Sequence, residues 1–304
     1  MSGLQNTLID DLPLNEGVSV LTHNKDGLLA LEKPIGLMSH PNTYRDNKKS
    51  ILTADYDLEK QCYKWINSAG VLNRVWLINR LDSPTSGIIL LGLNSAISDS
   101  IKIEFASRNV SKVYYAIVRE KPSRHTGTWK DQLVKDLRNG KQVVKNAKIV
   151  NAKTRYKALQ SPIGGFPVTL MKLMPLTGRT HQLRIQCQKH GVPIVGDRSY
   201  GHFPFNREVV AHTKIKRMLL HAAETHVHYS YKGHVRDFSV VSKACEDIEH
   251  IHHLAYINGT ENFYKKPELV LDVAASGIIN LYNCCFAVKL TNDLLKNLIS
   301  CSSV

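Results

Sequence analysis

Apolar residues in this chain of 304 residues occur in short runs of strand length, and polar segments that contain Pro or Gly separate the runs. The first run, residues 28–31, leads into a turn at 33–36 (KPIG), where Pro fixes its own φ and Gly tolerates a tight backbone. Residues 76–78 and 88–91 form two further runs, joined by the polar segment 79–87 (NRLDSPTSG). A polar connection between two buried strands is a common place for functional side chains.

One segment has the periodicity of an amphipathic helix instead. Apolar residues recur every four positions over 97–105, with charged residues between them. Residues 112–118 and 168–174 are again rich in strand formers, whereas 180–189 fits either a short helix with Thr180 near its N-terminus or a strand. The order strand, helix, strands, helix, strands predicts an α+β fold with antiparallel pairing rather than a doubly wound parallel sheet.

The charge is strongly positive and unevenly distributed. Lys and Arg number 40 against 26 Asp and Glu, which gives a net charge of +14 with neutral His. Residues 245–304 hold 4 basic and 7 acidic side chains, so residues 1–244 carry a net charge of +17. A body this basic indicates a polyanionic partner, and RNA, DNA and an acidic membrane are all open at this point. Part of the charge lies in the polar segment 119–153, whose residues 135–141 (KDLRNGK) are typical of a hairpin tip.

Several classes of protein are disfavoured by what the sequence lacks. The first 17 residues contain no basic start followed by an apolar stretch, as a secretory signal would. The most apolar window, 269–290, is interrupted by Asp and Asn and indicates a buried element rather than a membrane span. Six cysteines without a CxxC pair are typical of reduced thiols in an intracellular protein. Neither a zinc-binding motif nor a Gly-rich phosphate loop occurs, so we expect no metal and no cofactor.

Three polar islands contain the residues suited to chemistry. The first is Arg80-Leu81-Asp82, with Thr, Ser and Gly at 85–87. The second, 176–184 (LTGRTHQLR), has two arginines, a histidine and hydroxyl groups, an array of donors for phosphates or a carboxylate. The third, 193–201 (PIVGDRSYG), follows an apolar strand end with an acid, a base and an aromatic residue. Taken singly, each island favours a structural turn or a solvated helix start over a catalytic site.

Taken together, and in this order along residues 20–240, the islands resemble the RluA-type family of RNA pseudouridine synthases. The resemblance rests on six segments: LALEKPIGLMSHP at 29–41, NRLDSPTSGIILL at 79–91, KVYYA at 112–116, LTGRTHQLR at 176–184, GVPIVGDRSYG at 191–201 and LHA at 220–222. It implies a mixed, largely antiparallel central sheet flanked by helices and loops, with the active site in a central cleft. It also implies an enzyme that needs no cofactor or metal.

The resemblance assigns roles to individual residues as well. It implies that Asp82 is the essential carboxylate, Tyr114 the active-site tyrosine and Arg184 the basic partner of the aspartate. Arg80 is expected to occupy the space that an extruded uridine leaves.

Further residues of the two later motifs are expected to act around this centre. Arg179, His181 and Gln182 are ascribed to substrate binding, through support of their loop and of RNA phosphates. Asp197 and Tyr200 are expected to build a turn.

These residue types suit the isomerisation of uridine, in which the N1–C1′ bond breaks, the base turns and a C5–C1′ bond forms. A target stacked in RNA must first be extruded, at a cost of roughly a few kcal/mol that contacts with the RNA backbone offset. Arg184 is expected to keep Asp82 ionised in a cleft that excludes water, since water at an activated C1′ would hydrolyse the glycosidic bond. Whether Asp82 attacks the sugar or the base, or removes a sugar proton, stays open. Tyr114 can stack on the base or help to move the C5 proton.

The chain departs from the family pattern at two positions and divides into three regions. Many members have His where Asn79 and Gln186 stand, and both replacements keep hydrogen-bonding ability. Residues 1–19 are expected to form an N-terminal extension, 20–244 the catalytic domain and 245–304 a C-terminal extension packed on it.

RNA is expected to be held mainly by the catalytic domain and by the basic segment 119–153, because no S4-type RNA-binding domain is recognised ahead of residue 28. Both rRNA and tRNA are open as substrates, and we expect a cytoplasmic monomer that does not bind membranes. One rival function is a non-catalytic RNA-binding or chaperone protein on the same scaffold, for which Asp82, Tyr114 and Arg184 would be unnecessary. Another is a nucleoside hydrolase, which would call for a second carboxylate.

Overall fold

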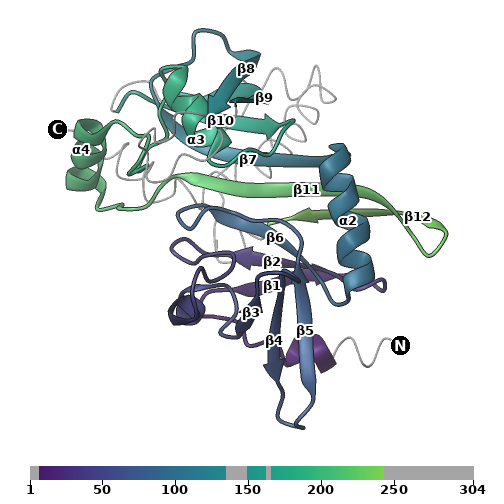
Figure 1. Ribbon diagram of the computed structural model, residues 1–304. Helices are drawn as coiled ribbons and strands as arrows, with labels where there is room; N and C mark the ends of the chain where they lie inside the picture. Colours follow the sequence, from purple (N-terminus) through teal and green to yellow (C-terminus); the bar gives the residue numbers. More distant parts are fainter. Residues whose placement is uncertain (1–6, 135–148, 162–165, 243–304) are drawn as a thin grey trace, which may run out of the picture.

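The computed structural model describes residues 7–134, 149–161 and 166–242, and strands are the commonest secondary structure in this part of the chain (Figure 1). Its strands are β1 Ser19–His23, β2 Leu28–Lys33, β3 Asp55–Asp57, β4 Cys62–Ile66, β5 Leu72–Leu77, β6 Ser86–Gly92, β7 Val110–Arg119, β8 Thr126–Val134, β9 Ile149–Gln160, β10 Val168–Pro175, β11 Leu220–Tyr231 and β12 His234–Val241. Its helices include α2 Ser95–Ser107, α3 Gln182–Lys189, α4 Phe203–Thr213 and the 3-10 helix η1 Tyr44–Lys49.

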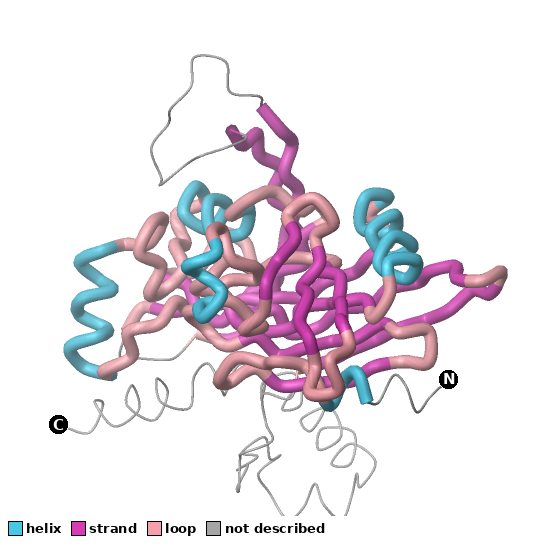
Figure 2. The backbone as a smooth tube through the Cα atoms, turned by 60° about the horizontal axis from the view of Figure 1, so that its bottom comes forward, coloured by secondary structure: helices cyan, strands magenta, loops and turns pink. Residues whose placement is uncertain are grey.

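The strands of the described part form one curved sheet (Figure 2). Its central path runs β3-β4-β5-β6-β11-β7-β10-β9-β8. Off this path, β2 pairs with β6, β1 pairs with β2, and β12 pairs with β11. Every pairing between these strands is antiparallel except that of β6 with β11. The prediction of a mixed, largely antiparallel sheet in an α+β fold is therefore confirmed.

The parallel pair β6–β11 is the seam between an N-terminal half, β1–β6, and a C-terminal half, β7–β12. Its two register pairs are Ser86 with His221 and Gly87 with Ala222. Gly87 has a φ of +115°, and a Cβ at this position would lie 2.1 Å from the Ala222 carbonyl oxygen, so only glycine permits the approach. Ser86 Oγ accepts a hydrogen bond from Arg217 Nη2 at 2.7 Å and lies 2.9 Å from His221 Nδ1, which adds side-chain bonds at the seam.

The C-terminal half has a core on each face of β7, because successive side chains of a strand point to opposite faces. Tyr115 and Ile117 pack with residues of α4, and Ala116 and Val118 pack with residues of α3. Tyr114 packs at the margin of the α3 core and therefore shares that face of the sheet.

The N-terminal half closes around a separate core. Leu31 of β2 and Ile89 of β6 belong to a cluster that also includes Leu12 and Val18, from the segment ahead of β1. The neighbouring Ile88 points the other way and joins the cluster that α2 covers. The chain ahead of β1 thus contributes apolar side chains to this half.

The elements confirm the main predictions from periodicity. The apolar runs at 28–31 and 88–91 lie in β2 and β6, and the periodic segment 97–105 lies within α2. The segment 180–189 forms the helix α3 rather than a strand. Its N-cap residue is His181, with a φ of 52°, so Thr180 lies next to the N-terminus of the helix, as predicted.

Other predictions fall partly or wholly outside the described residues. The hairpin tip at 135–141, the apolar window 269–290 and the C-terminal extension 245–304 all lie there. Within the described part, no helix has both the length and the apolar character needed to cross a membrane. Cys62 and Cys187 are buried free thiols.

Replacement of Gly87 by alanine should weaken the seam. The new methyl group would meet backbone atoms of Ala222 and would also occupy a strained positive φ. We expect Gly87→Ala to lower the free energy of unfolding by about 3 kcal/mol, measured by urea denaturation. Gly70→Ala is the matched control, because Gly70 also has a positive φ of +75° but a Cβ added there would meet no atom within 4 Å. Equal losses of stability in the two variants would contradict a special role of the seam.

Candidate active site

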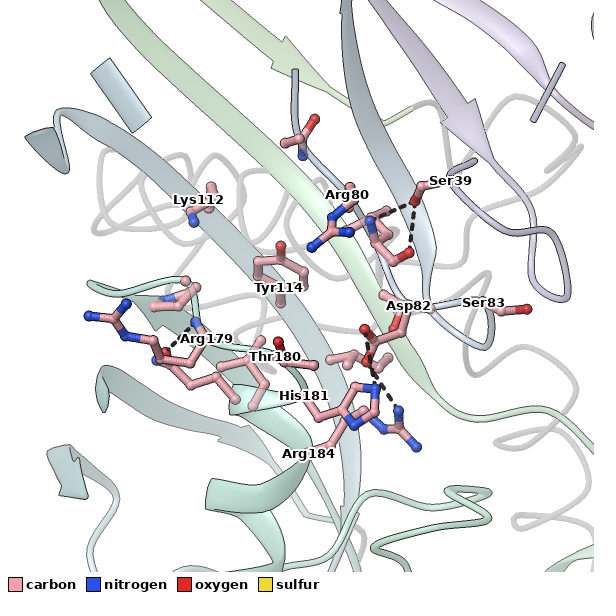
Figure 3. Close-up of a pocket in the computed structure, with 18 of the residues that line it drawn as sticks. Ser39, Arg80, Asp82, Ser83, Lys112, Tyr114, Arg179, Thr180, His181 and Arg184 are labelled. Carbon is pink, nitrogen blue, oxygen red and sulfur yellow. Dashed lines mark hydrogen bonds and ion pairs between the residues drawn. The ribbon is translucent and has the colours of Figure 1, made fainter. Parts of the chain in front are cut away.

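A cleft of about 610 Å³ lies where the two halves of the sheet meet. Residues from the segments 38–42 and 78–85 of the N-terminal half line one side, and residues from the segment 175–184 of the C-terminal half line the other. Tyr114 of β7 lies between these two walls (Figure 3). The cleft is lined by all seven residues that the sequence analysis assigned to the site: Arg80, Asp82, Tyr114, Arg179, His181, Gln182 and Arg184.

The loop that carries Asp82 is fixed by hydrogen bonds from both sides. Asn79 Oδ1 accepts from the backbone N–H of Leu90 at 2.7 Å, which ties the start of the loop to β6. Ser39 Oγ accepts from the N–H of Leu81 and donates to the carbonyl oxygen of Leu81, each at 2.8 Å. These bonds leave the backbone next to Asp82 little freedom, so its carboxylate is presented at one position in the cleft.

Arg184 of α3 bonds to two carboxylates at once. Its Nε and Nη2 donate to Asp197 Oδ2 and Oδ1 at 2.7 and 2.9 Å, and its Nη1 donates to Asp82 Oδ2 at 3.1 Å. The Asp197 side chain is fully buried, whereas 27 % of the Asp82 side chain is exposed. The two-point pairing with Asp197 fixes the plane of the guanidinium, and this plane directs one N–H toward the cleft.

Arg184 and Asp197 each favour the charged form of the other. Burial disfavours the charged form of Arg184, but its hydrogen bonds to Asp197 and the charges of Asp197 and Asp82 outweigh burial and raise its pKa. Burial also acts to raise the pKa of Asp197, but hydrogen bonds from Arg184 and from the backbone N–H groups of Ser199 and Tyr200 lower it overall. Asp197 was expected only to build a turn. It does bond to that turn, and it also holds Arg184.

Tyr114 brings a neutral phenol into the cleft. Burial, together with the negative charge of Asp82, raises its pKa well above the ordinary value, so the hydroxyl keeps its proton at neutral pH. Lys112 also lines the cleft, two residues earlier on the same face of β7, and burial lowers its pKa. Sequence reasoning missed Lys112, although the alternation of side chains along a strand could have placed it beside Tyr114.

Arg80 is oriented by a histidine that the sequence analysis did not single out. His40 Nδ1 lies 3.0 Å from the Pro41 carbonyl oxygen, which only accepts, so Nδ1 carries the proton. His40 Nε2 therefore accepts the hydrogen bond from Arg80 Nη1, at 3.3 Å. The imidazole ring stacks on Tyr56 with centroids 4.9 Å apart. The exposed Arg80 guanidinium points over the cleft toward Tyr114 (Figure 3).

Gln182 holds the loop on the opposite wall. Its Oε1 accepts from Thr177 Oγ1 at 2.7 Å and from the Arg179 N–H at 3.1 Å, and its Nε2 donates to the Lys153 carbonyl oxygen at 3.2 Å. Both ends of this buried amide are thus bonded within the protein. Gln182 therefore positions the loop that presents Arg179 and His181.

The other two residues of this loop lie closer to solvent. His181 places Nε2 3.8 Å from Asp82 Oδ1, while its Nδ1 lies 3.0 Å from the Tyr200 hydroxyl. Arg179 is exposed at the rim, where its Nε donates to the Asn151 carbonyl oxygen at 3.2 Å. His181 thus lies beside the carboxylate on the side of α3, whereas Arg179 lies across the cleft from it (Figure 3).

The two departures from the family pattern both serve in the framework of the site. Asn79 anchors the Asp82 loop through its bond to Leu90. Gln186 lies fully buried on α3, where it accepts from Thr154 Oγ1 at 2.6 Å and donates to Asp131 Oδ2 at 2.8 Å. These bonds tie the helix that carries Arg184 to strands β8 and β9.

Lys33 connects the end of β2 to the Asp82 loop. Its fully buried Nζ donates to three carbonyl oxygens, those of Pro34 at 2.9 Å, Leu37 at 2.8 Å and Ser83 at 3.2 Å. Burial lowers the pKa of Lys33 to about 7, although the negative charge of Asp82 opposes the shift. Its place in the KPIG turn was visible in the sequence, but its contact with the residue after Asp82 was not.

The site thus contains one partly exposed carboxylate, a neutral phenol and several cationic groups. Among the residues that the structure describes, no group of three or more His, Cys, Asp or Glu side chains is placed to hold a metal ion. The arrangement suits a ligand with a neutral planar ring and an anionic chain, because the ring can enter the cleft while the chain meets the cationic rim.

Comparisons with known proteins agree with this site. The family model described as RNA pseudouridylate synthase matches residues 27–189, which is more than half of the chain. The chain belongs to this family. The match includes the Asp82 loop, Tyr114 and the α3 segment with Arg184. The chain is also 28 % identical to dual-specificity RNA pseudouridine synthase RluA of Vibrio vulnificus over 245 residues, 80 % of this chain and 90 % of the relative. The resemblance to RluA-type pseudouridine synthases is thereby confirmed.

Two curated relatives and one solved structure illustrate the similarity. The chain is 29 % identical to tRNA pseudouridine synthase C of Pectobacterium carotovorum over 229 residues, 70 % of this chain and 56 % of the relative. It is 33 % identical to ribosomal large subunit pseudouridine synthase C of Rickettsia prowazekii over 210 residues, 66 % of this chain and 61 % of the relative. The chain thus spans less than two thirds of either relative.

The structure of human RNA pseudouridylate synthase domain containing 1 has a TM-score of 0.53 and 24 % sequence identity. The match covers 74 % of this chain and 83 % of the human chain. At this level of identity the similarity concerns the fold.

Removal of the Asp197 charge should weaken the site and the fold together. Asp197→Asn keeps the shape of the side chain but leaves the buried Arg184 cation with Asp82 alone. We expect a loss of about 3 kcal/mol in the free energy of unfolding at pH 7, measured by urea denaturation. Because the folded-state pKa of Asp197 is lowered, its contribution is present above the ordinary carboxyl pKa of about 4. The difference between wild type and variant should therefore shrink as the pH falls below that value, and a constant difference down to about pH 2 would argue against the ion pair.

Lys33 should give the stability a distinct dependence on pH. Its pKa is about 7 in the folded protein against an ordinary value of 10.5, so above pH 7 the unfolded chain binds the proton more strongly. Raising the pH from about 7 to about 9 should therefore stabilise the wild-type fold relative to Lys33→Met, which cannot titrate there. Urea midpoints of both proteins at several pH values measure this difference. Parallel curves would show that Lys33 keeps an ordinary pKa.

Proposed function

We propose that the protein isomerises uridine to pseudouridine in a structured RNA, either rRNA or tRNA, with Asp82 as the essential residue. Membership of the pseudouridylate synthase family supports this reaction. The names of the relatives support both classes of RNA, since one is a tRNA enzyme and another a ribosomal large subunit enzyme.

The observation that carries the proposal is the position of the Asp82 carboxylate. This carboxylate accepts a hydrogen bond from Arg184 Nη1, while Nε and Nη2 of the same guanidinium donate to Asp197. The bond to Arg184 fixes the position of Oδ2, while the partial exposure of the side chain leaves an oxygen accessible in the cleft. A carboxylate fixed in this way can act on C1′, on the base or on a sugar proton without first being released from a stronger partner.

The other residues act on the nucleotide around that carboxylate. Tyr114 presents a neutral ring at the centre of the cleft, which favours contact with the face of the uracil. Arg80 stands over the cleft and fills the place of the extruded nucleotide in the RNA stack. Arg179 and His181 line the opposite wall, where they meet the phosphates. Once nucleotide and protein fill the cleft, water has little access to C1′, so hydrolysis is suppressed.

The variant Asp82→Asn tests the proposal. It removes the charge but keeps the size of the side chain, so folding and RNA affinity should stay close to wild type while isomerisation falls by about 10³-fold or more. The substrates are unmodified rRNA and tRNA transcripts, with carbodiimide-adduct mapping and tritium release from C5 as readouts, because product and substrate have equal mass. Ser83→Ala, a neighbour whose Oγ bonds to the Gly36 carbonyl oxygen, is the control for damage to the loop.

Other results would assign other functions. Full activity of Asp82→Asn would refute the catalytic role of the carboxylate. Free uracil in place of pseudouridine would indicate a hydrolase, and tight binding of RNA without any conversion by the wild-type protein would indicate a binding or chaperone role.

A further inference from the structure

The outer face of the β8–β9 hairpin carries a row of exposed cations. In both strands buried and exposed residues alternate, and Lys130 of β8 and Lys153, Arg155 and Lys157 of β9 all fall on exposed positions. Their buried neighbours point the other way, toward α3. We name these four residues the basic face. The two strands reach outward from the body of the molecule (Figure 2).

The register of the two strands places these cations side by side. Lys130 lies directly opposite Lys153, and Thr128 and Thr126 lie opposite Arg155 and Lys157. Like charges on directly opposite residues of an antiparallel pair destabilise the sheet. None of the ion pairs within the described part of the chain involves a member of the basic face. The face is therefore a concentration of positive charge without an internal counterion among these residues.

The charge excess ends at the next strand. Lys172 of β10 is paired in register with Lys157, but its Nζ lies 3.6 Å from Glu224 Oε1. Lys172 therefore has an acidic partner within the sheet, Glu224 of β11, whereas the four cations of the basic face have none among the described residues. The contrast indicates that the unpaired cations of β8 and β9 serve an external anion.

The basic face begins beside the wall of the cleft. The cleft loop 176–182 runs along β9 beyond the end of β10, where the Leu176 N–H donates to the Lys153 carbonyl oxygen at 2.8 Å and the Lys153 N–H donates to Thr177 Oγ1 at 2.8 Å. Arg179, at the rim of the cleft, donates to the Asn151 carbonyl oxygen of the same strand. A chain of phosphates that leaves the cleft past Arg179 therefore reaches β9 at Asn151. Because the cleft lies on the α3 side of the sheet and the basic face points away from α3, the phosphate chain passes around the edge of β9 to meet the basic face.

We propose that the basic face binds the phosphate backbone of the substrate RNA outside the cleft. This inference rests on the proposed function for the identity of the polyanion. Cations at every second residue of a strand lie about 6.6–6.8 Å apart, which forms a regular row suited to successive phosphates. The exposed positions of the two described strands hold no aromatic side chain on which a base could stack, so their contacts are with the backbone and independent of sequence. The face thus adds affinity, and the cleft alone selects the uridine.

The test compares two variants in which the same amount of positive charge is removed. One replaces Lys130, Lys153, Arg155 and Lys157 by Gln. The matched control replaces four exposed cations on other elements, Lys60, Arg74, Lys216 and Lys232, by Gln. For each protein the affinity for an unmodified tRNA transcript pool is measured over a range of salt concentrations, and urea denaturation verifies the fold.

We expect the slope of log affinity against log salt to become shallower by about 0.7–0.9 for each phosphate that the first variant no longer neutralises. Its affinity at about 0.1 M salt should fall at least tenfold, while kcat at saturating RNA stays at the wild-type value. An equal change of slope in the control would show a general effect of net charge and overturn the proposal. So would an unchanged slope in the first variant together with weaker binding to phosphatidylserine vesicles, which would assign the face to a membrane.

The proposed function fails separately from this inference. If the first variant shows the expected change of slope but the wild-type protein forms no pseudouridine, the role of the basic face is supported and the proposed isomerase activity is refuted. If isomerisation occurs but the first variant matches wild type in slope and affinity, only the role of the basic face is refuted.

Discussion

The site depends on the sharing of one guanidinium between two carboxylates. Asp197 takes two donors of Arg184 in a fully buried pair, and a further donor reaches Asp82 in the cleft. A buried ion pair contributes little net stability by itself, because desolvation opposes the attraction of the charges. Its value here is geometric, since the two-point bond fixes the direction of the third N–H and therefore the position of the Asp82 carboxylate.

The same constraint explains why the cleft lies at the seam of the sheet. Asp82 comes from the loop ahead of β6, and Arg184 comes from α3 in the other half of the molecule. The two can meet only because β6 and β11 pair across the seam, where Gly87 permits the approach of the two backbones. Lys33 and Ser39 then hold the Asp82 loop from the N-terminal side through backbone atoms. The contacts that hold the two halves of the sheet and the Asp82 loop together therefore also position the residues of the site.

Much of this could be inferred before the structure, for a physical reason. The residues around Asp82 and Arg184 stand in continuous segments whose types and order resemble those of a known family, and this resemblance indicated them before the structure. Contacts between distant segments were not accessible in the same way. The partner of Arg80, His40, lies 40 residues away, and Asp197 was expected to form a turn and not to hold Arg184. Lys112 was missed because a lysine in a strand indicates solvent unless the covering wall is known.

The amino-acid sequence by itself indicated the apolar runs of β2, β5, β6, β7 and β10, the helix at 97–105 and the positive charge, because these follow from local periodicity and composition. The set of site residues followed from the resemblance of ordered motifs to a known family. The tertiary structure alone decided how the carboxylates of Asp82 and Asp197 are placed around Arg184. Asp82 and Asp197 both stand close to arginines in sequence, and both bond to Arg184 in space. Burial distinguishes them, since Asp197 is fully buried while Asp82 is partly exposed in the cleft. Burial depends on the packing of distant segments, so it is a property of the whole fold rather than of any one segment.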